Sequence, residues 1–100
     1  MIKGGDFVHK RHKYKVLKDK QNITGEMINF YRTQKGLSAQ QLSDKLIMMG
    51  LDIHRQAIFA IESGKRTVAD YELCLIAEVL GIPTNELLKN FIDQIRKENY

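Results

Sequence analysis

Few side chains in this sequence have the type and spacing that metal binding or catalysis requires. His9 and His12 are three residues apart, so on a helix both imidazoles could bind one metal ion. No third ligand lies near them in the sequence, and His54 is remote, so we expect no metal site. Cys74 is the one cysteine, and it falls in an apolar run. This position predicts a buried thiol rather than a nucleophile.

The other nucleophiles and acids form no catalytic pattern. The serines lack the G-x-S-x-G turn of hydrolases, and the carboxylates are scattered among cationic neighbours without an acid–base pair. Gly64-Lys65 is not part of a nucleotide P-loop. Phe59 stands where that motif needs glycine, and Arg66 stands where it needs Ser or Thr. We therefore expect no enzyme activity and no cofactor.

Positive charge is concentrated at the start of the chain, whose net charge is +4. Residues 1–20 hold seven Lys/Arg and two Asp/Glu, whereas residues 21–100 hold nine and ten. We therefore predict a basic arm over residues 1–22. Such an arm attracts nucleic acid or an anionic membrane surface, and the alternative is a solvated tail. A membrane role is disfavoured because the arm has no clear amphipathic stripe.

Length and composition favour one soluble domain, which we place at residues 23–100. The chain has 100 residues, of which 43% are hydrophobic and 28% charged, enough for a packed core. No apolar run is long enough to cross a membrane, and the start MIKGGDFVHKRHKYK lacks the apolar core of a secretory signal. A single cysteine suits a reducing compartment. We expect a cytoplasmic protein.

From Asn22 onward the apolar residues recur at helical spacing and predict five helices. We place them at about residues 24–35, 38–49, 55–63, 70–80 and 85–97. Ser38 and Gln41 have the spacing of a capping box, and glycines follow the first four helices, where they can adopt the left-handed conformation of a helix end. The predicted core residues are Met27, Ile28, Tyr31, Ala39, Leu42, Leu46, Met49, Ala57, Ile58, Ile61, Leu73, Ile76, Ala77, Leu80, Leu88, Phe91, Ile92 and Ile95.

Three segments of the chain together resemble a known family. They read KGLSAQQLSDKL, RQAIFAIESGKR and DYELCLIAEVLGIPTNELL. In this order they resemble the Cro/repressor-type helix-turn-helix proteins, also called the xenobiotic-response-element family, over about residues 22–90. The resemblance implies an all-α, compact five-helix lambda-repressor-like domain. It also implies that the third helix enters the major groove of double-stranded DNA, which is about 12 Å wide and admits one helix.

The resemblance assigns base contacts to the outward residues around the start of the third helix, His54, Arg55, Gln56, Phe59 and Ala60. Arg55 can pair with guanine and Gln56 with adenine, each through two hydrogen bonds. Phe59 can pack on a thymine methyl group. Ala60 falls where many relatives have a polar side chain, so sequence information at that position is reduced. The alternative for Arg55 and Gln56 is an ordinary solvated helix face.

The resemblance assigns phosphate contacts to two places. One is the start of the second helix, where the helix dipole favours an anion. The other is the loop after the third helix, where exposed N–H groups and two cations suit phosphate. The residues in these places are Ala39, Gln40, Ser63, Gly64, Lys65, Arg66 and Thr67.

The family also pairs an arginine of its first helix with a glutamate of its third, here Arg32 and Glu62. Two exposed charges, worth less than about 1 kcal/mol, are the alternative. The chain departs from the family between Leu46 and His54, where the stretch is longer than usual. We expect either a longer second helix or an enlarged turn. His54 is a weak cap for the third helix, and Asp52 is an alternative cap.

The resemblance thus predicts a transcriptional regulator, a repressor that binds operator DNA as a homodimer. The fourth and fifth helices have more apolar positions than one small core needs, so we place the dimer contact on the fifth helix. The alternative is a protein-interaction module on the same scaffold, such as an antitoxin-like partner. Met48, Met49 and Leu51 form an apolar cluster that either packs in the core or binds such a partner.

Overall fold

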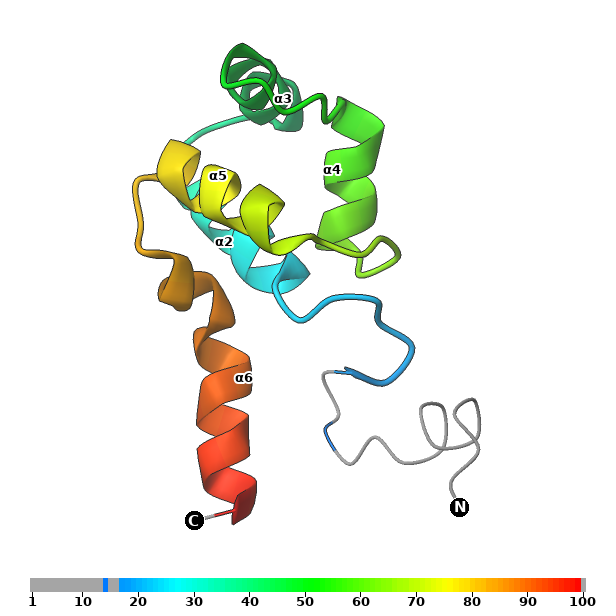
Figure 1. Cartoon of the computed structure of the whole chain (residues 1–100), viewed down its shortest axis with the longest axis vertical. Helices are drawn as coiled ribbons and strands as arrows, with labels where there is room; N and C mark the ends of the chain where they lie inside the picture. Colours follow the sequence, from blue (N-terminus) through cyan, green and yellow to red (C-terminus); the bar gives the residue numbers. More distant parts are fainter. Residues whose placement is uncertain (1–13, 15–16, 100) are drawn as a thin grey trace.

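A computed structural model describes Tyr14 and residues 17–99 (Figure 1). It contains five α-helices where the sequence predicts them. No strand occurs among these residues, and the all-α class is confirmed. The last helix begins one residue earlier and ends two residues later than predicted. The helices are α2 (Gly25–Gln34), α3 (Ala39–Met48), α4 (Arg55–Glu62), α5 (Asp70–Leu80) and α6 (Thr84–Asn99).

The predicted capping box forms at the start of α3. Ser38 Oγ accepts a hydrogen bond from the Gln41 N–H at 3.0 Å, and Gln41 Oε1 accepts one from the Ser38 N–H at 2.8 Å. Two backbone N–H groups at the helix start, which no turn of the helix can satisfy, therefore have partners. This fixes the residue at which α3 begins.

The connection between α3 and α4 is an enlarged turn rather than an extension of α3. Gly50 has φ +92°, and the Leu51 N–H donates to Leu46 O at 2.9 Å, which ends α3 in a Schellman motif. Ser43, buried in α3, donates its hydroxyl to Ile53 O at 2.7 Å. Leu51 and Ile53 are themselves buried. The turn is thus held to the core at Leu51 and Ile53.

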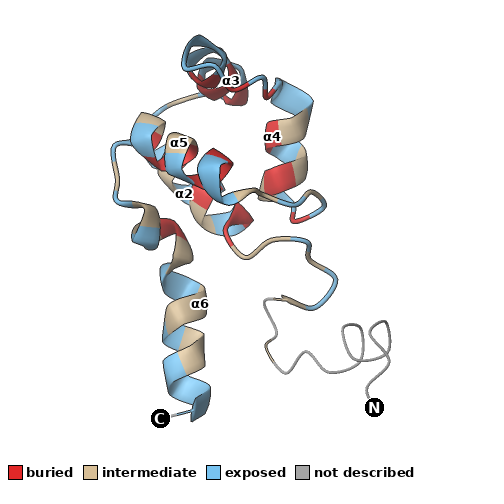
Figure 2. Ribbon diagram, in the orientation of Figure 1, coloured by how far each residue is buried: buried red, intermediate tan, exposed pale blue. Residues whose placement is uncertain are grey.

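The core lies where α2, α3, α4 and α5 meet the first turns of α6 (Figure 2). Most predicted core residues of α2 to α5 are buried there, and Met27, Tyr31 and Ala57 pack against it partly buried. Leu87, which we did not predict, is buried at the start of α6. The four residues predicted for the core from α6 are only half-buried, because α6 continues beyond the other helices. These residues are Leu88, Phe91, Ile92 and Ile95.

Two predicted burials are wrong. Met49 is exposed because it follows the last residue of α3, where the chain leaves the helical path, and Leu51 takes the core position instead. Cys74 is exposed although its neighbours are apolar. Consecutive residues of a helix lie about 100° apart, so the adjacent Leu73 faces the core while Cys74 faces solvent.

Tyrosines join α6 to other parts of the molecule. Tyr31 of α2 donates its hydroxyl to Glu86 Oε2 at 2.9 Å, and this hydrogen bond raises the pKa of Tyr31. Near the middle of α6, the ring of Tyr14 packs edge-on against Phe91 with 5.2 Å between ring centroids. Asn99 Nδ2 donates to Tyr14 Oη at 3.1 Å. In the described part of the chain, no helix is long and apolar enough to cross a membrane.

Candidate nucleic-acid interface

Helix α4 has one buried face and one exposed face. Ile58 and Ile61 are each 1% exposed and pack in the core. Arg55 and Gln56 are exposed on the first turn, and Phe59 is 50% exposed one turn later. Residues spaced by three or four lie on the same side of a helix, so these three side chains form one outward surface. Of the remaining predicted base readers, His54 is exposed, whereas Ala60 is half-buried.

His54 precedes α4 but does not cap it. Its side chain makes no capping hydrogen bond, and its Nε2 lies 2.8 Å from Asp52 Oδ1. Asp52, the predicted alternative cap, therefore contacts the imidazole of His54. Both side chains are largely exposed. This contact lies at the end of α4 that bears Arg55.

Of the two residues at the start of α3 that are predicted to contact phosphate, one can do so only through its backbone. The side chain of Ala39 is buried, so only its backbone can face a phosphate. Gln40 is exposed, and its Nε2 donates to Asp44 Oδ1 at 2.9 Å. The amide of Gln40 is therefore held along the exposed face of α3.

In the loop after α4, two backbone N–H groups have acceptors within the chain. The Gly64 N–H donates to Ile61 O at 3.0 Å and the Lys65 N–H donates to Ala60 O at 2.9 Å, which completes the end of α4. Gly64 is also buried. Both backbone N–H groups are thus engaged in the end of α4, and the phosphate contact predicted for Gly64 stays a prediction.

Other groups of this loop remain open to solvent. Ser63, Lys65 and Thr67 are exposed, and Ser63 Oγ donates to Ala60 O at 3.2 Å. Within residues 17–99, the backbone N–H groups of Arg66 and Thr67 donate to no acceptor. The loop therefore offers a phosphate group the Lys65 ammonium, two hydroxyls and two backbone N–H groups.

Arg66 has a structural partner. Its Nη1 and Nη2 donate to the two carboxylate oxygens of Glu72 at 3.1 and 3.0 Å, and Nη1 also donates to Thr67 O at 2.9 Å. Glu72 Oε1 in turn accepts the Ala69 N–H at 2.9 Å, at the start of α5. The Arg66 guanidinium holds the pKa of Glu72 below its usual value, and the Ala69 N–H acts in the same direction.

Arg32 and Glu62 form an ion pair between α2 and α4. Arg32 Nε donates to Glu62 Oε2 at 2.6 Å, and Nη2 donates to Oε1 at 2.9 Å. The Arg32 side chain is 10% exposed and that of Glu62 is 7% exposed. Arg32 Nη1 also donates to Leu37 O, and Asn29 donates to Glu62 Oε1. Both charged groups are therefore enclosed and hydrogen-bonded, which holds the end of α4 against α2.

Helices α2 and α4 are in close contact at Gly25. A Cβ atom at this position would overlap the backbone oxygen of Ile61 and crowd that of Glu62. Only glycine lets the first turn of α2 lie against the last turn of α4. The absence of a side chain therefore sets the distance between the two helices.

Sequence reasoning missed the contacts made by residues 20–22, which we had assigned to the arm. Asn22 Nδ2 donates to Ile61 O at 3.0 Å and Arg66 O at 2.8 Å, while its Oδ1 accepts the N–H groups of Thr24 and Gly25. Asn22 thus accepts two N–H groups at the start of α2 and holds the last turn of α4 together with the loop after it. An asparagine just before a predicted helix is a typical capping signal and could have revealed the first role.

The remaining candidate chemistry has no site in the described structure. His9 and His12 lie outside the described residues. Among the described ones, no three His, Cys, Asp or Glu side chains gather in a way that could hold a metal ion. A hollow of about 410 Å³ lies between residues 20–27, the end of α4 and α6, and is lined in part by Asn22, Glu26 and Asn90.

The arrangement of α3, the turn and α4 agrees with comparison to known families. A helix-turn-helix family model matches residues 28–87. The chain belongs to the Cro/C1-type helix-turn-helix family. No significant match is found among curated proteins or among solved structures.

The helix-turn-helix match contains the parts described above. It begins within α2 and ends within α6, so it includes α3, the enlarged turn, α4 and both partners of the Arg32–Glu62 pair. The family consists of DNA-binding regulatory domains and is not a family of enzymes. DNA binding is therefore the general function of this helix-turn-helix chain.

Proposed function

We propose that this protein is a sequence-specific transcriptional repressor that places α4 in the major groove of operator DNA. The observation that supports this most directly is the division of α4. Ile58 and Ile61 hold the helix in the core, while Arg55, Gln56 and Phe59 point outward from it. A helix can present its side chains to a groove only when another surface holds it in this way.

The side chains of the outward surface match the groups on base edges. The Arg55 guanidinium can donate two hydrogen bonds to guanine, and the Gln56 amide can both donate to and accept from adenine. Phe59 offers an apolar face to a thymine methyl group. His54, in contact with Asp52, lies at the same end of α4. Ala60 is half-buried and has no polar group, so it adds no hydrogen bond.

Phosphate contacts on both sides of α4 would fix its register in the groove. We assign them to the start of α3 and to the loop after α4, since contacts to the DNA backbone position a reading helix. At α3 the groups are the Ala39 backbone and the Gln40 side chain. In the loop they are the side chains of Ser63, Lys65 and Thr67, together with the backbone N–H groups of Arg66 and Thr67.

A homodimer formed through α6 would place two copies of α4 on successive turns of the same DNA face, about 34 Å apart. The apolar residues Leu88, Ile92 and Ile95 of α6 are only half-buried in the single chain. Binding of such a dimer near a promoter would block polymerase by occupancy. A repressor of phage or bacterial type would carry out this function in the cytoplasm.

The test is selection of bound duplexes from a random pool, followed by affinity measurements on the selected duplex and its single-base variants. We expect Arg55→Ala to lose about 1–3 kcal/mol of binding free energy and to lose preference at one base pair. Lys65→Ala should weaken binding to all duplexes equally and reduce the salt dependence. If the two variants behave identically across the duplexes, the division into base and phosphate contacts is wrong.

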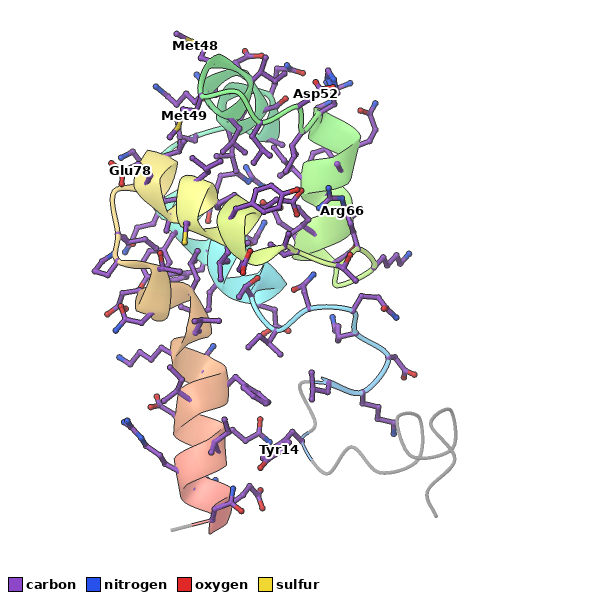
Figure 3. The ribbon with its side chains drawn as sticks, in the orientation of Figure 1. Tyr14, Met48, Met49, Asp52, Arg66 and Glu78 are labelled. Carbon is purple, nitrogen blue, oxygen red and sulfur yellow. The ribbon has the colours of Figure 1, made fainter. Side chains whose placement is uncertain are left out.

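One observation favours a second candidate, a protein-interaction module on the same scaffold. Ile47, Met48 and Met49 are consecutive and all exposed, and Met48 is 86% exposed. Figure 3 shows Met48 at the end of the molecule formed by α3, far from Tyr14. This candidate replaces the first if the native chain enriches no duplex at low salt. If it enriches a defined duplex sequence, the repressor assignment stands.

A further inference from the structure

The loop after α4 has one fewer unpaired cation than its sequence implies. Lys65 and Arg66 are adjacent in the sequence, and both were expected to face phosphate. Both terminal nitrogens of Arg66 donate to Glu72, whose side chain is only 9% exposed. The charge of Arg66 is thus balanced by a nearly buried carboxylate. Lys65 is exposed and remains as the one unpaired cation of the loop itself.

A second cation reaches this loop from the N-terminal segment. The methylene groups of Lys20 lie against Gly64, in the space that a Cβ atom would fill if residue 64 had one. Lys20 Nζ donates to Ser63 O at 3.4 Å. The Lys20 ammonium therefore lies on the same loop as Lys65, although the two residues are far apart in the sequence.

The position of Lys20 is set by the residues that follow it. The Gln21 N–H donates to Gly64 O at 2.7 Å, and the Asn22 amide holds Ile61 O and Arg66 O. The two residues after Lys20 are thereby attached by three hydrogen bonds to the last turn of α4 and to the loop that follows it. Figure 1 shows this segment, in blue, passing beside the loop that follows α4. The lysine is thus part of the loop surface rather than of a free tail.

The charge of Lys20 is available to an external anion. An ammonium group has three N–H donors, and the long bond to Ser63 is the one that the described residues provide. No carboxylate of residues 17–99 lies within ion-pair distance of Lys20, and Glu62, which lines the adjacent hollow, is paired with Arg32. An ammonium is a compact point charge, which suits a phosphate oxygen better than the planar edge of a base.

From these contacts we propose that Lys20 binds a phosphate of the DNA backbone, so that Lys20 and Lys65 together form the two-cation phosphate site of the loop. The inference rests on the proposed DNA binding and adds to it a contact from outside the segment matched by the family model. It assigns this contact to one positioned side chain. General attraction by the basic arm would involve the other lysines of the segment equally.

Three variants separate these possibilities. Lys20→Met keeps methylene packing on Gly64 and removes the charge, whereas Lys20→Arg keeps the charge. Lys18→Met is the matched control, since Lys18 is exposed in the same segment and loses the same charge. Each protein is titrated with the selected duplex at several salt concentrations, and thermal unfolding checks that all four chains are folded.

We expect Lys20→Met to reduce the slope of log K against log salt by about 0.9, the value for one phosphate contact, and to weaken all duplexes by the same factor. Lys20→Arg should retain most of the slope, and Lys18→Met should retain all of it. A duplex carrying neutral methylphosphonate at the contacted phosphate should bind the native chain more weakly and should not weaken Lys20→Met further.

Each other result overturns the inference. Equal losses in Lys20→Met and Lys18→Met would show diffuse attraction by the arm. An unchanged slope in Lys20→Met, with duplex binding by the native chain intact, would remove Lys20 and leave the proposed function standing. If the native chain binds no duplex at any salt concentration, both the proposed function and the phosphate site fail.

Discussion

The Arg32 guanidinium and the Glu62 carboxylate face each other with two hydrogen bonds, Nε to Oε2 at 2.6 Å and Nη2 to Oε1 at 2.9 Å. The pair connects α2 with the last turn of α4, where Glu62 directly follows the buried Ile61. Two enclosed charges depend on each other, because either one alone would be buried without compensation. The pair therefore controls how α4 is seated.

Arg32→Ala should lower the free energy of unfolding by about 3–5 kcal/mol, because it leaves the Glu62 carboxylate buried and unpaired. Chemical denaturation with urea measures this loss. Gln34→Ala, at an exposed position of the same helix, is the control and should change stability by less than about 0.5 kcal/mol. Equal effects in the two variants would mean that the pair contributes nothing in solution.

Gly25→Ala should destabilise the protein by about 1–3 kcal/mol, although alanine favours helix more than glycine does. The added Cβ would overlap Ile61 O, so α2 and α4 must move apart. Thermal unfolding of this variant beside Glu26→Ala, an exposed neighbour in α2, measures the effect. A gain in stability at position 25 would show that the two helices are not in close contact.

Ser43→Ala should cost about 1–3 kcal/mol, because the buried carbonyl of Ile53 loses its hydrogen-bond donor. The comparison is Thr33→Ala, which removes an exposed hydroxyl that also donates to backbone carbonyls. Denaturant unfolding of both variants should show a clear loss only at Ser43. Were the two losses alike, the enlarged turn would not depend on this bond.

The Glu72 carboxylate should make stability depend on pH. Its folded pKa is lowered from an ordinary value of 4.5, chiefly by hydrogen bonds from Arg66. The stabilisation is therefore fully present above the ordinary pKa and is lost as the pH falls through the lower folded pKa. The difference in unfolding free energy between native and Glu72→Gln chains should be largest near neutral pH and shrink below about 4.5. A difference independent of pH would contradict this.

The native chain should sediment as a dimer at micromolar concentration in low salt if α6 forms the proposed interface. Ile95→Lys should then give a monomer, because it places a charge among the half-buried apolar residues of α6. Glu98→Lys, which introduces the same residue at an exposed position of α6, should remain dimeric. A monomeric native chain would remove the proposed interface.

The sequence predicted the helices well because their starts and ends are local signals. The Ser38 capping box and the helical spacing of apolar residues involve neighbours only a few positions apart. The same reasoning failed for Met49 and Cys74, where burial depends on how the helix is oriented in the fold. The spacing of apolar residues alone does not reveal where a helix leaves its path.

The candidate site was predictable only in part for a similar reason. The outward residues of α4 followed from the resemblance, whereas the partners of individual side chains did not. Arg66 was expected to face phosphate, but its bonds to Glu72 depend on the path of the chain between α4 and α5. The contact of Lys20 with Gly64 joins distant parts of the chain, which no local pattern encodes.

The two faces of α4 have a consequence for the evolution of this protein. Stability depends on the inward Ile58 and Ile61, while the outward Arg55 and Gln56 are exposed. Substitutions at exposed positions usually change stability by less than about 0.5 kcal/mol. Under the proposed function, the preferred operator can therefore change by mutation at these two positions while the chain remains folded, so new targets are accessible without compensating changes elsewhere.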